Sequence, residues 1–350
     1  MNQPTPLQTL SDFYQMLPKI DLHRHLEGSI RVKTLMEVAR AHGFEIPNTG
    51  ELRTMVQVNP EEPYTFQNFL TKFQNLRVFY RSPEIISRIT RETIEDAYSD
   101  HIRYLELRFT PAALSKAQDY SLAEVVKWVI AGKEQAEQEF DIRVGLIASF
   151  NRHESVELAT QIIQLATDHL GDGFLGVDLA GNEAQFPALP FAGALKEAQQ
   201  AGLHVTVHAG EWGPASNVVE AIEKLSAERI GHGVRVMEDS KAMAIACERE
   251  IPFEVCLTSN YQSGVVHELS RHPLMHMLQA GLNATINTDD PCICGVTLSH
   301  EYHMACNALG MRLVTLKERV LAAARASFLP DHEKEDLIRS IQYEFPHMIY

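Results

Sequence analysis

Apolar residues gather along the chain in eight short stretches that are rich in Val, Ile, Leu and Phe and that end in polar residues. These stretches occupy residues 19–23, 102–109, 143–150, 174–179, 203–207, 229–232, 252–257 and 283–287. Runs of this length and composition predict β-strands, and from the second run onward segments with helical spacing of apolar residues separate them. Eight strands that alternate with helices predict an α/β protein with a (β/α)8 TIM barrel, formed as one domain by residues 1–350.

The alternative architecture for such a pattern is an open, doubly wound parallel sheet. A sheet of that kind usually carries a glycine-rich phosphate loop directly after its first strand. In this chain the same position holds His23, Arg24 and His25. The sequence therefore favours the barrel.

Two of the expected helices carry signals at their ends. Pro190 precedes an apolar stripe and Gly202 follows it, which predicts a helix between them. Another stripe begins at Val218, directly after Ser216 and Asn217. Because Ser and Asn side chains accept hydrogen bonds from the first turn of a helix, we expect these two residues to cap it.

The segment between the first two strands, from His25 to Ile102, is much longer than the other connections. Loops that follow barrel strands lie at the catalytic end, so a helical insertion at about residues 30–100 is predicted to form a lid. Within it, apolar residues follow helical spacing at Phe66, Phe69, Leu70, Phe73 and Leu76. Such a stripe indicates core packing by default, and it also fits a lid if the helix packs over the barrel mouth.

Composition and charge narrow the classes of partner. The chain has 31 Lys and Arg residues against 46 Asp and Glu residues, which gives a formal net charge of −15. An acidic protein is a poor match for nucleic acid or for an anionic membrane surface, so we expect neither as a partner. The five scattered cysteines, the lack of a signal-like N-terminus and the lack of a long apolar run predict a protein of the reducing cytoplasm.

Histidines and carboxylates stand at the ends of several predicted strands. His23 and His25 are two positions apart on the first strand, so their side chains point to the same side. His208 ends the fifth strand and Glu211 follows three residues later, while His232 lies between two glycines at the sixth. Since the ends of all barrel strands meet at one mouth, these side chains are expected to converge.

Two adjacent carboxylates, Asp289 and Asp290, follow the eighth strand. Alone they indicate a turn that caps the next helix, but two buried carboxylates repel each other unless a positive group holds them. Together with His23, His25 and His208, one of the two aspartates completes a metal site of three imidazoles and a carboxylate. This donor set is typical of zinc and also accepts other first-row divalent metals. Glu211 and His232 are candidates for acid and base catalysis beside it.

Several short motifs resemble those of the adenosine and adenine deaminases, a family of metal-dependent hydrolases. They are KIDLHRHLEGS (19–29), DLAGNE (178–183), HAGE (208–211), GHG (231–233), CLTSN (256–260) and NTDDP (287–291). The motifs occur in the family's order and spacing, up to about residue 310. The resemblance implies a barrel with one zinc ion and the hydrolytic deamination of adenosine and 2′-deoxyadenosine to inosine and ammonia in purine salvage.

The resemblance also implies a role for each site residue. His23, His25, His208 and Asp289 resemble the zinc ligands. Glu211 resembles the residue that gives a proton to purine N1, and His232 resembles the group that orients the attacking hydroxide and takes up its proton. Asp290 resembles an acceptor that faces N7, and the amide of Gly181 resembles the donor to N3. The substrate-binding set is then His25, Glu27, Gly181, Asp290, Phe69 and Leu70.

The substrate and the number of metals have alternatives. Adenosine deaminases usually carry Asp where this chain has Glu27, and adenine-specific members often carry Glu, whereas the sequence FLTKF at residues 69–73 resembles the lid of adenosine deaminases. We therefore expect adenosine as substrate, with adenine or a 5′-modified adenosine as alternatives. A two-metal hydrolase usually has a Lys at the end of strand four, and residues 178–181 contain none. A non-catalytic purine binder and a hydrolase of another C–N bond are the remaining alternatives.

Overall fold

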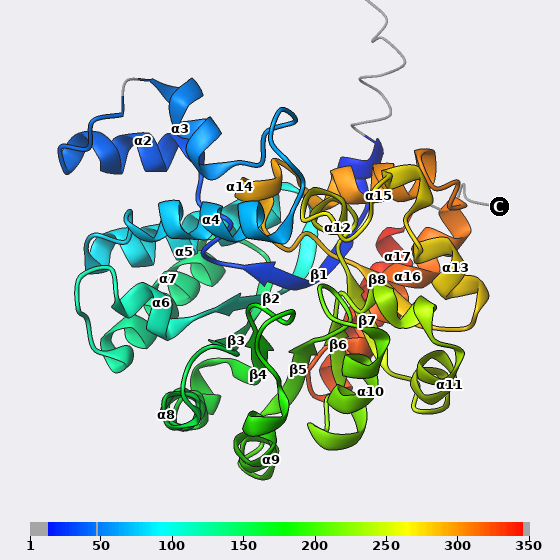
Figure 1. Ribbon diagram of the computed structural model, residues 1–350. Helices are drawn as coiled ribbons and strands as arrows, with labels where there is room; N and C mark the ends of the chain where they lie inside the picture. Colours follow the sequence, from blue (N-terminus) through cyan, green and yellow to red (C-terminus); the bar gives the residue numbers. More distant parts are fainter. Residues whose placement is uncertain (1–12, 47, 346–350) are drawn as a thin grey trace, which may run out of the picture.

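The computed structural model describes residues 13–46 and 48–345, and its centre is a ring of eight parallel strands (Figure 1). The strands are β1 (Lys19–His25), β2 (Ile102–Phe109), β3 (Arg143–Asn151), β4 (Phe174–Ala180), β5 (His204–His208), β6 (Arg229–Gly231), β7 (Pro252–Val255) and β8 (Asn283–Ile286). Each strand pairs with the next one along the chain. The predicted barrel and its eight strands are confirmed, while both ends of the predicted domain, 1–12 and 346–350, lie outside the described residues.

The barrel closes where the chain beyond β8 meets β1. Arg24 and Asp289 form a parallel bridge, in which the backbone N–H of His25 donates to the carbonyl of Asp289 at 2.8 Å. The N–H of Asp289 donates to the carbonyl of His23 at 2.8 Å. These bonds hold the end of β1 against the residues after β8, which brings the motifs from both ends of the sequence together.

Helices surround the strands (Figure 1). Between β1 and β2 lie α2 (Val32–Ala41), α3 (Thr49–Val56), α4 (Phe66–Arg77) and α5 (Pro83–Ser99). The helices between β2 and β8 are α6 (Pro111–Ser115), α7 (Leu122–Glu139), α8 (Val156–Asp168), α9 (Ala192–Gln200), α10 (Ala215–Lys224), α11 (Ser240–Glu248), α12 (Leu257–Gln262) and α13 (Leu274–Gln279). After β8 come α14 (Pro291–Cys294), α15 (Leu298–Asn307), α16 (Leu313–Ala326) and α17 (Asp331–Glu344). Short 3-10 turns are η1 (Leu170–Asp172), η2 (Leu189–Phe191), η3 (Val234–Glu238) and η4 (Leu269–Arg271).

The two helix-end predictions had different outcomes. The helix between Pro190 and Gly202 is confirmed as η2 followed by α9, and Gly202 has a positive φ of 96° that favours glycine. The predicted cap of α10 is wrong. Pro214 is its N-cap residue, no side chain caps it, and Ser216 and Asn217 lie inside the first turn.

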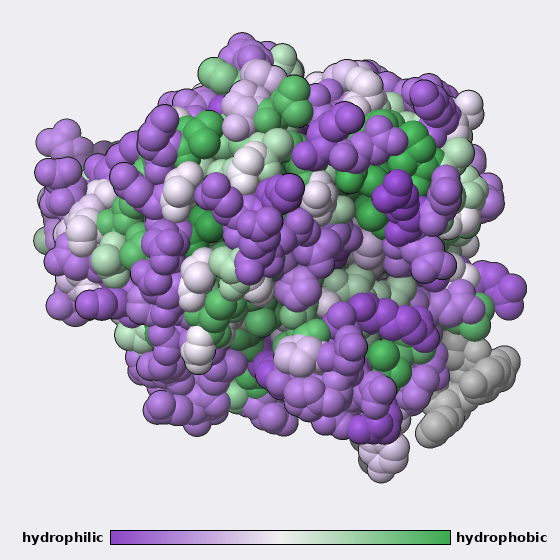
Figure 2. All heavy atoms as spheres, turned by 90° about the horizontal axis from the view of Figure 1, so that it is seen from below, coloured by the Kyte–Doolittle hydropathy of each residue, from purple (hydrophilic) through white to green (hydrophobic). Residues whose placement is uncertain are grey.

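The strands are buried on both faces, as expected for a parallel sheet with its interior filled by side chains and its exterior covered by helices. Every residue of β1 is buried, and only Arg103 of β2 is partly exposed. The face of the molecule in Figure 2 is mostly polar, with apolar side chains in small separate groups. Among the described residues, no helix has the length and apolar character needed to cross a membrane.

Charged side chains fill part of the barrel interior. Arg229 on β6 lies between Glu106 of β2 and Glu254 of β7, and its Nε is 2.7 Å from the Glu254 carboxylate. Arg108 contacts the other oxygen of Glu254 at 2.8 Å. Burial alone would raise the pKa of Glu254, but the two guanidinium groups hold it well below its usual range. This network was not predicted, although charged residues inside a buried strand such as 102–109 are a signal for it.

Replacing the central arginine of this network is expected to destabilise the barrel. Arg229→Met leaves Glu106 and Glu254 with fewer positive partners in a buried site, so the free energy of unfolding should fall by about 3–5 kcal/mol. Urea-induced unfolding of the metal-saturated protein measures the change. The matched control is Arg339→Met, because Arg339 pairs with Asp336 at the surface and is 66% exposed. It should change the same quantity by less than about 0.5 kcal/mol, and equal effects of the two variants would contradict a stabilising role of the network.

Candidate active site

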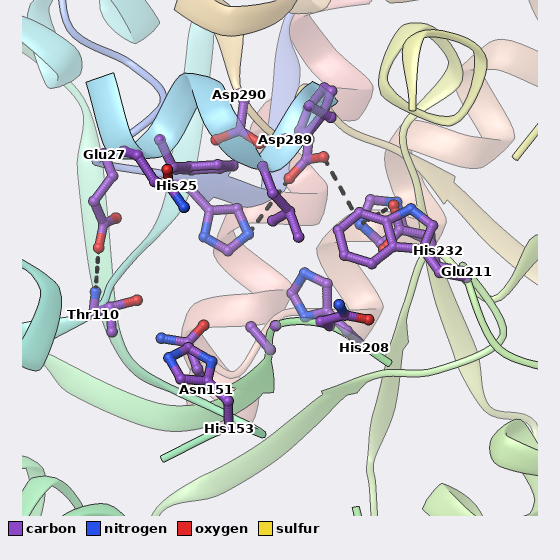
Figure 3. Close-up of a pocket in the computed structure, with 18 of the residues that line it drawn as sticks. His25, Glu27, Thr110, Asn151, His153, His208, Glu211, His232, Asp289 and Asp290 are labelled. Carbon is purple, nitrogen blue, oxygen red and sulfur yellow. Dashed lines mark hydrogen bonds and ion pairs between the residues drawn. The ribbon is translucent and has the colours of Figure 1, made fainter. Parts of the chain in front are cut away.

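All the residues predicted for the site except His23 line one cavity of about 230 Å³ at the carboxyl ends of the strands. Those that line it are His25, Glu27, Phe69, Leu70, Gly181, His208, Glu211, His232, Asp289 and Asp290. Figure 3 shows Glu27 with Thr110 on one side of the cavity and Glu211 with His232 on the opposite side. The apolar stripe of α4 contributes Phe69, Leu70 and Phe73 to the cavity, so this helix packs over the barrel mouth, while Leu76 is buried in the core.

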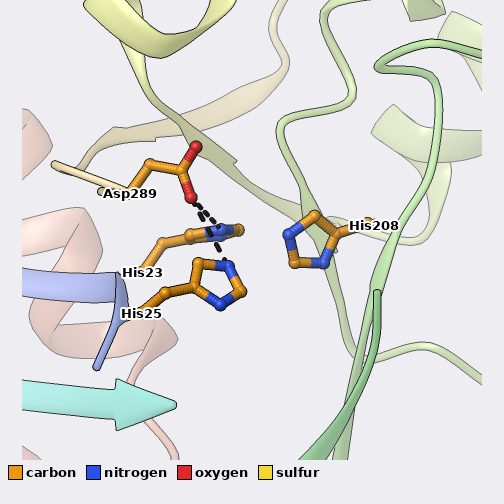
Figure 4. A group of neighbouring side chains, drawn as sticks. All are labelled: His23, His25, His208 and Asp289. Carbon is orange, nitrogen blue, oxygen red and sulfur yellow. Dashed lines mark ion pairs between the residues drawn. The ribbon is translucent and has the colours of Figure 1, made fainter. Parts of the chain in front are cut away.

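Three imidazoles and one carboxylate converge beside this cavity (Figure 4). In His23, His25, His208 and Asp289, one ligand atom from each residue lies within 4.8 Å of the others. The Oδ1 of Asp289 is 3.3 Å from the Nε2 of His23 and 3.4 Å from the Nε2 of His25. The Nε2 of His23 is buried without a hydrogen-bond partner. A buried nitrogen that faces three other metal-ligating groups fits a bound first-row divalent cation.

Two buried carboxylates hold the other ring nitrogens of these histidines. The Nδ1 of His23 is 2.7 Å from Glu254, and the Nδ1 of His208 is 2.9 Å from Asp178. A carboxylate on one nitrogen fixes the ring and leaves the other nitrogen free for a metal. Both Nε2 atoms are thereby directed to the site. The roles of Glu254 and Asp178 were not predicted, although Asp178 lies in the DLAGNE motif.

Glu211 and His232 face each other across 3.7 Å, between the Glu211 Oε1 and the His232 Nε2. Burial, together with the charges of Asp289 and Glu183, raises the pKa of Glu211 well above its usual range. Burial lowers the pKa of His232 well below its usual range although Asp289 opposes the shift. Both shifts favour the uncharged form, a protonated carboxyl group in Glu211 and a neutral imidazole in His232.

A chain of buried hydrogen bonds determines which nitrogen of His232 carries the hydrogen. The backbone N–H of Leu274 donates to the Nδ1 of His272 at 3.1 Å, and burial lowers the pKa of His272 to about 3, so its Nε2 carries the only ring hydrogen. That Nε2 donates to the Oδ1 of Asn260 at 3.2 Å. The Asn260 amide nitrogen then donates to the Nδ1 of His232 at 3.0 Å. The Nε2 of neutral His232, which faces Glu211, is consequently a hydrogen-bond donor.

The two glycines next to His232 leave room for the side chains that pack against them. A Cβ on Gly231 would lie 3.2 Å from the Cα and ring of His208, and one on Gly233 would lie 2.4 Å from the ring of Phe253. His232 itself has a positive φ of 57°, a conformation that non-glycine residues rarely adopt. A positive φ in a buried residue at a cavity is a strain typical of functional sites. The surroundings of His232 are therefore crowded.

The adjacent carboxylates Asp289 and Asp290 have opposite environments. Burial disfavours the charge of Asp289, but the imidazoles of His232 and His23 hold its pKa well below the usual range. Ser259 also donates to the Oδ2 of Asp289 at 2.6 Å. Burial and the neighbouring charge of Asp289 raise the pKa of Asp290 well above its usual range. The two shifts favour an ionised Asp289 beside a neutral Asp290, which reduces the repulsion expected between two charged groups.

Asp290 is held in place by its contact with the backbone at Gly28. A Cβ at position 28 would lie 1.8 Å from the Oδ1 of Asp290 and 2.6 Å from its Cβ, so only glycine fits there. The Oδ1 of Asp290 is buried without a hydrogen-bond partner. Across the cavity, Gly181 has a positive φ of 91°. The two residues expected to face opposite edges of a purine therefore both line the cavity.

Comparison with known proteins agrees with this geometry. A family model described as adenosine deaminase matches residues 18–344. The adenosine deaminase of Klebsiella pneumoniae (strain 342) is 36% identical over 327 residues, which cover 93% of this chain and 98% of that protein.

Two solved structures share the fold. The adenine deaminase of Arthrobacter aurescens has a TM-score of 0.86 at 28% identity, covering 93% of this chain and 98% of that one. An amidohydrolase of Burkholderia ambifaria with bound zinc has a TM-score of 0.88 at 26% identity, covering 98% of this chain and 94% of that one.

Proposed function

The chain belongs to the adenosine deaminase family, and on this premise we propose that it converts adenosine and 2′-deoxyadenosine to inosine or 2′-deoxyinosine and ammonia by hydrolysis. The observation that carries this proposal is the position of Glu211. A buried carboxyl group whose raised pKa favours the protonated form lies opposite an imidazole whose lowered pKa favours the neutral form, in a cavity beside a cluster of metal-ligating groups. Hydrolysis of a purine C–N bond needs these components, namely a proton donor for the ring and an activated water.

We propose zinc as the resident metal, one ion per chain, held by His23, His25, His208 and Asp289. The orphaned Nε2 of His23 and the four converging donors support this assignment. When bound, zinc acts as a Lewis acid that lowers the pKa of a water molecule toward ~7. The carboxylates of Glu254 and Asp178 hold the rings of His23 and His208 for this purpose.

The protein groups divide the proton transfers between them. As water adds to C6 of the purine, the ring loses its aromaticity and N1 takes a proton, which neutral Glu211 supplies. His232 orients the water by donating its Nε2 hydrogen to the water oxygen, and ionised Asp289 accepts the proton that the water loses. When the bond between C6 and the amino group breaks, the amino group takes this proton from Asp289 and leaves as ammonia. The proton of the new C6 hydroxyl returns to Glu211, which leaves the 6-oxo group of the product and restores both carboxyl groups. This division differs from the role expected for His232 from the sequence, because the bond from Asn260 leaves its pocket-facing nitrogen already protonated.

Asp290 and Gly181 position the purine from two edges. N7 of a purine is a hydrogen-bond acceptor, and neutral Asp290 donates to it, the reverse of the direction expected from the sequence. The amide N–H of Gly181 donates to N3 on the other edge of the ring. Phe69 and Leu70 of α4 cover the bound purine as a lid and exclude water, which strengthens the polar contacts in the cavity.

We propose that Glu27 binds a hydroxyl group of the ribose. Its Oε1 accepts a hydrogen bond from the backbone N–H of Thr110 at 2.6 Å, and its Oε2 is buried without a partner. Figure 3 shows Glu27 on the side of the cavity away from Glu211, where a substituent on the purine would extend. The 5′-hydroxyl of the ribose then donates a hydrogen bond to the Oε2 of Glu27. Free adenine has no such hydroxyl and leaves this oxygen unpaired.

Glu27→Gln tests this substrate assignment. The amide oxygen keeps the bond from Thr110, but the free acceptor becomes an NH2 group, so kcat/KM for adenosine should fall about 10-fold, as for one lost hydrogen bond. Turnover of adenine should stay unchanged. Ammonia release is measured in parallel with adenosine, 2′-deoxyadenosine, adenine and a 5′-substituted adenosine. If the wild-type protein prefers adenine, the chain is an adenine deaminase, and if only the 5′-substituted compound reacts, the substrate is a modified nucleoside.

A further inference from the structure

Glu183, in the loop after β4, is bound by a run of consecutive backbone amides. Its carboxylate accepts hydrogen bonds from the N–H groups of Gly210, Glu211, Trp212 and Gly213, at 2.7, 3.0, 3.0 and 2.9 Å. Glu183 is buried, with 6% of its surface exposed. Successive N–H groups that converge on one anion form a nest, a geometry that binds negative charge. Here the anion is a side chain of the same protein.

Other residues around Glu183 also hold its carboxylate or leave room for it. The side-chain amide of Asn217 donates to the same carboxylate at 2.9 Å. A Cβ on Gly213 would lie 2.7 Å from the Glu183 Oε1, so glycine is required for the close approach. Gly210 has a positive φ of 67°, which turns the chain directly after β5 and favours glycine. Glu183 does not line the cavity, whereas Glu211 and Trp212 do.

We propose that Glu183 is a positioning residue that fixes residues 210–213 and thereby directs the carboxyl group of Glu211 toward N1 of the purine. The inference rests on the proposed function, because it assumes that Glu211 is the proton donor. The loop has no regular secondary structure between β5 and α10, so the bonds to Glu183 replace the backbone bonds that a helix or strand would supply. The charge of Glu183 also contributes to the raised pKa of Glu211.

Glu183→Gln replaces one of the two acceptor oxygens by an NH2 group, which then faces amides that are themselves donors. We expect kcat for adenosine to fall about 100-fold, the order expected when a reacting group is displaced by about 1 Å. Because the purine contacts made by Asp290 and Gly181 remain, KM should change little. Amide hydrogen exchange of residues 210–213, measured by mass spectrometry, should become faster. Metal content should stay at the wild-type value.

A ligand without N1 separates positioning of Glu211 from general damage to the cavity. 1-Deazaadenosine has carbon in place of N1 and makes no hydrogen bond to Glu211, so Glu183→Gln should not change its binding constant. In a Glu211→Gln background, Glu183→Gln should cause no further loss of the residual rate. In Gly213→Ala the new methyl group displaces the Glu183 carboxylate, so this variant should reproduce the loss of kcat. It serves as the test if Glu183→Gln folds poorly.

The matched control is Asp100→Asn. Asp100 is equally buried and also accepts a backbone N–H, from Ser299 at 3.0 Å, but it lies between α5 and β2, at the end of the barrel opposite the cavity. This variant should leave kcat and loop exchange unchanged. The inference is overturned if Glu183→Gln keeps the wild-type kcat, or if kcat, 1-deazaadenosine binding and metal content fall together. If the wild-type protein releases no ammonia from any purine, it is the proposed function that fails.

Discussion

Replacing Glu211 by Gln is expected to lower kcat/KM for adenosine by about 10²–10⁴-fold, the range for the loss of a general acid. The glutamine has the same size and still offers a hydrogen bond, but it holds no proton that N1 can take. Burial raises the pKa of the wild-type carboxyl group and favours its protonated form, so the variant removes the proton and little else. Ammonia release at saturating and limiting adenosine measures the loss.

The loss must come without a loss of structure or of metal. Metal content and the melting temperature of Glu211→Gln should therefore match the wild-type values. Glu238→Gln is the matched control, because Glu238 is a half-exposed carboxylate paired with Arg235 outside the cavity. It should retain full activity. Wild-type turnover in Glu211→Gln would show that another group protonates the purine.

Replacing His208 by Ala is expected to remove the metal and nearly all activity. His208 supplies one of the three imidazoles, and its ring is fixed by Asp178 for this contact. Removing a residue that hydrogen-bonds to a metal ligand already lowers metal affinity by about 10–100-fold. Removing the ligand itself should therefore lower the affinity by more than that. Metal content after dialysis, measured by mass spectrometry, should fall from about one ion per chain to a small fraction.

The same strand supplies the control for this variant. His204 begins β5, at the opposite end from His208, and its Nδ1 lies 2.7 Å from Glu228 in a partly exposed pair. His204→Ala should keep both the metal and the activity. If His208→Ala retains its metal and its turnover, the proposed ligand set is wrong.

The pattern of apolar and polar residues along the chain was enough to predict the eight strands. It also predicted the clustering of the site residues, because the ends of all strands in a barrel meet at one mouth. His23 and Asp289 are far apart in sequence, yet each lies near the carboxyl end of a strand, and that position alone predicts that they meet. The carboxylates that hold the metal-ligating histidines from behind could not be found this way. Glu254 touches His23 across 231 positions of sequence, and its burial between two arginines follows from the register of the strands rather than from its neighbours in the chain.

The wrong cap prediction for α10 has a related cause. Ser and Asn near the start of a helix usually satisfy its free amides. In this chain Asn217 donates to Glu183 instead, and the helix begins earlier, at Ala215 after Pro214. The division of protons in the site was also not predictable from the sequence. It depends on His272 and Asn260, which orient His232 through bonds that only the folded chain forms.

The central claim is that this cavity hydrolyses the bond between C6 and the amino group of adenosine. The most direct test incubates zinc-replete protein with adenosine in water labelled with heavy oxygen and follows ammonia and the mass of the nucleoside together. The account predicts equal amounts of ammonia and of inosine labelled at its 6-oxo group. Protein that binds adenosine and its full complement of metal but forms neither product would contradict it.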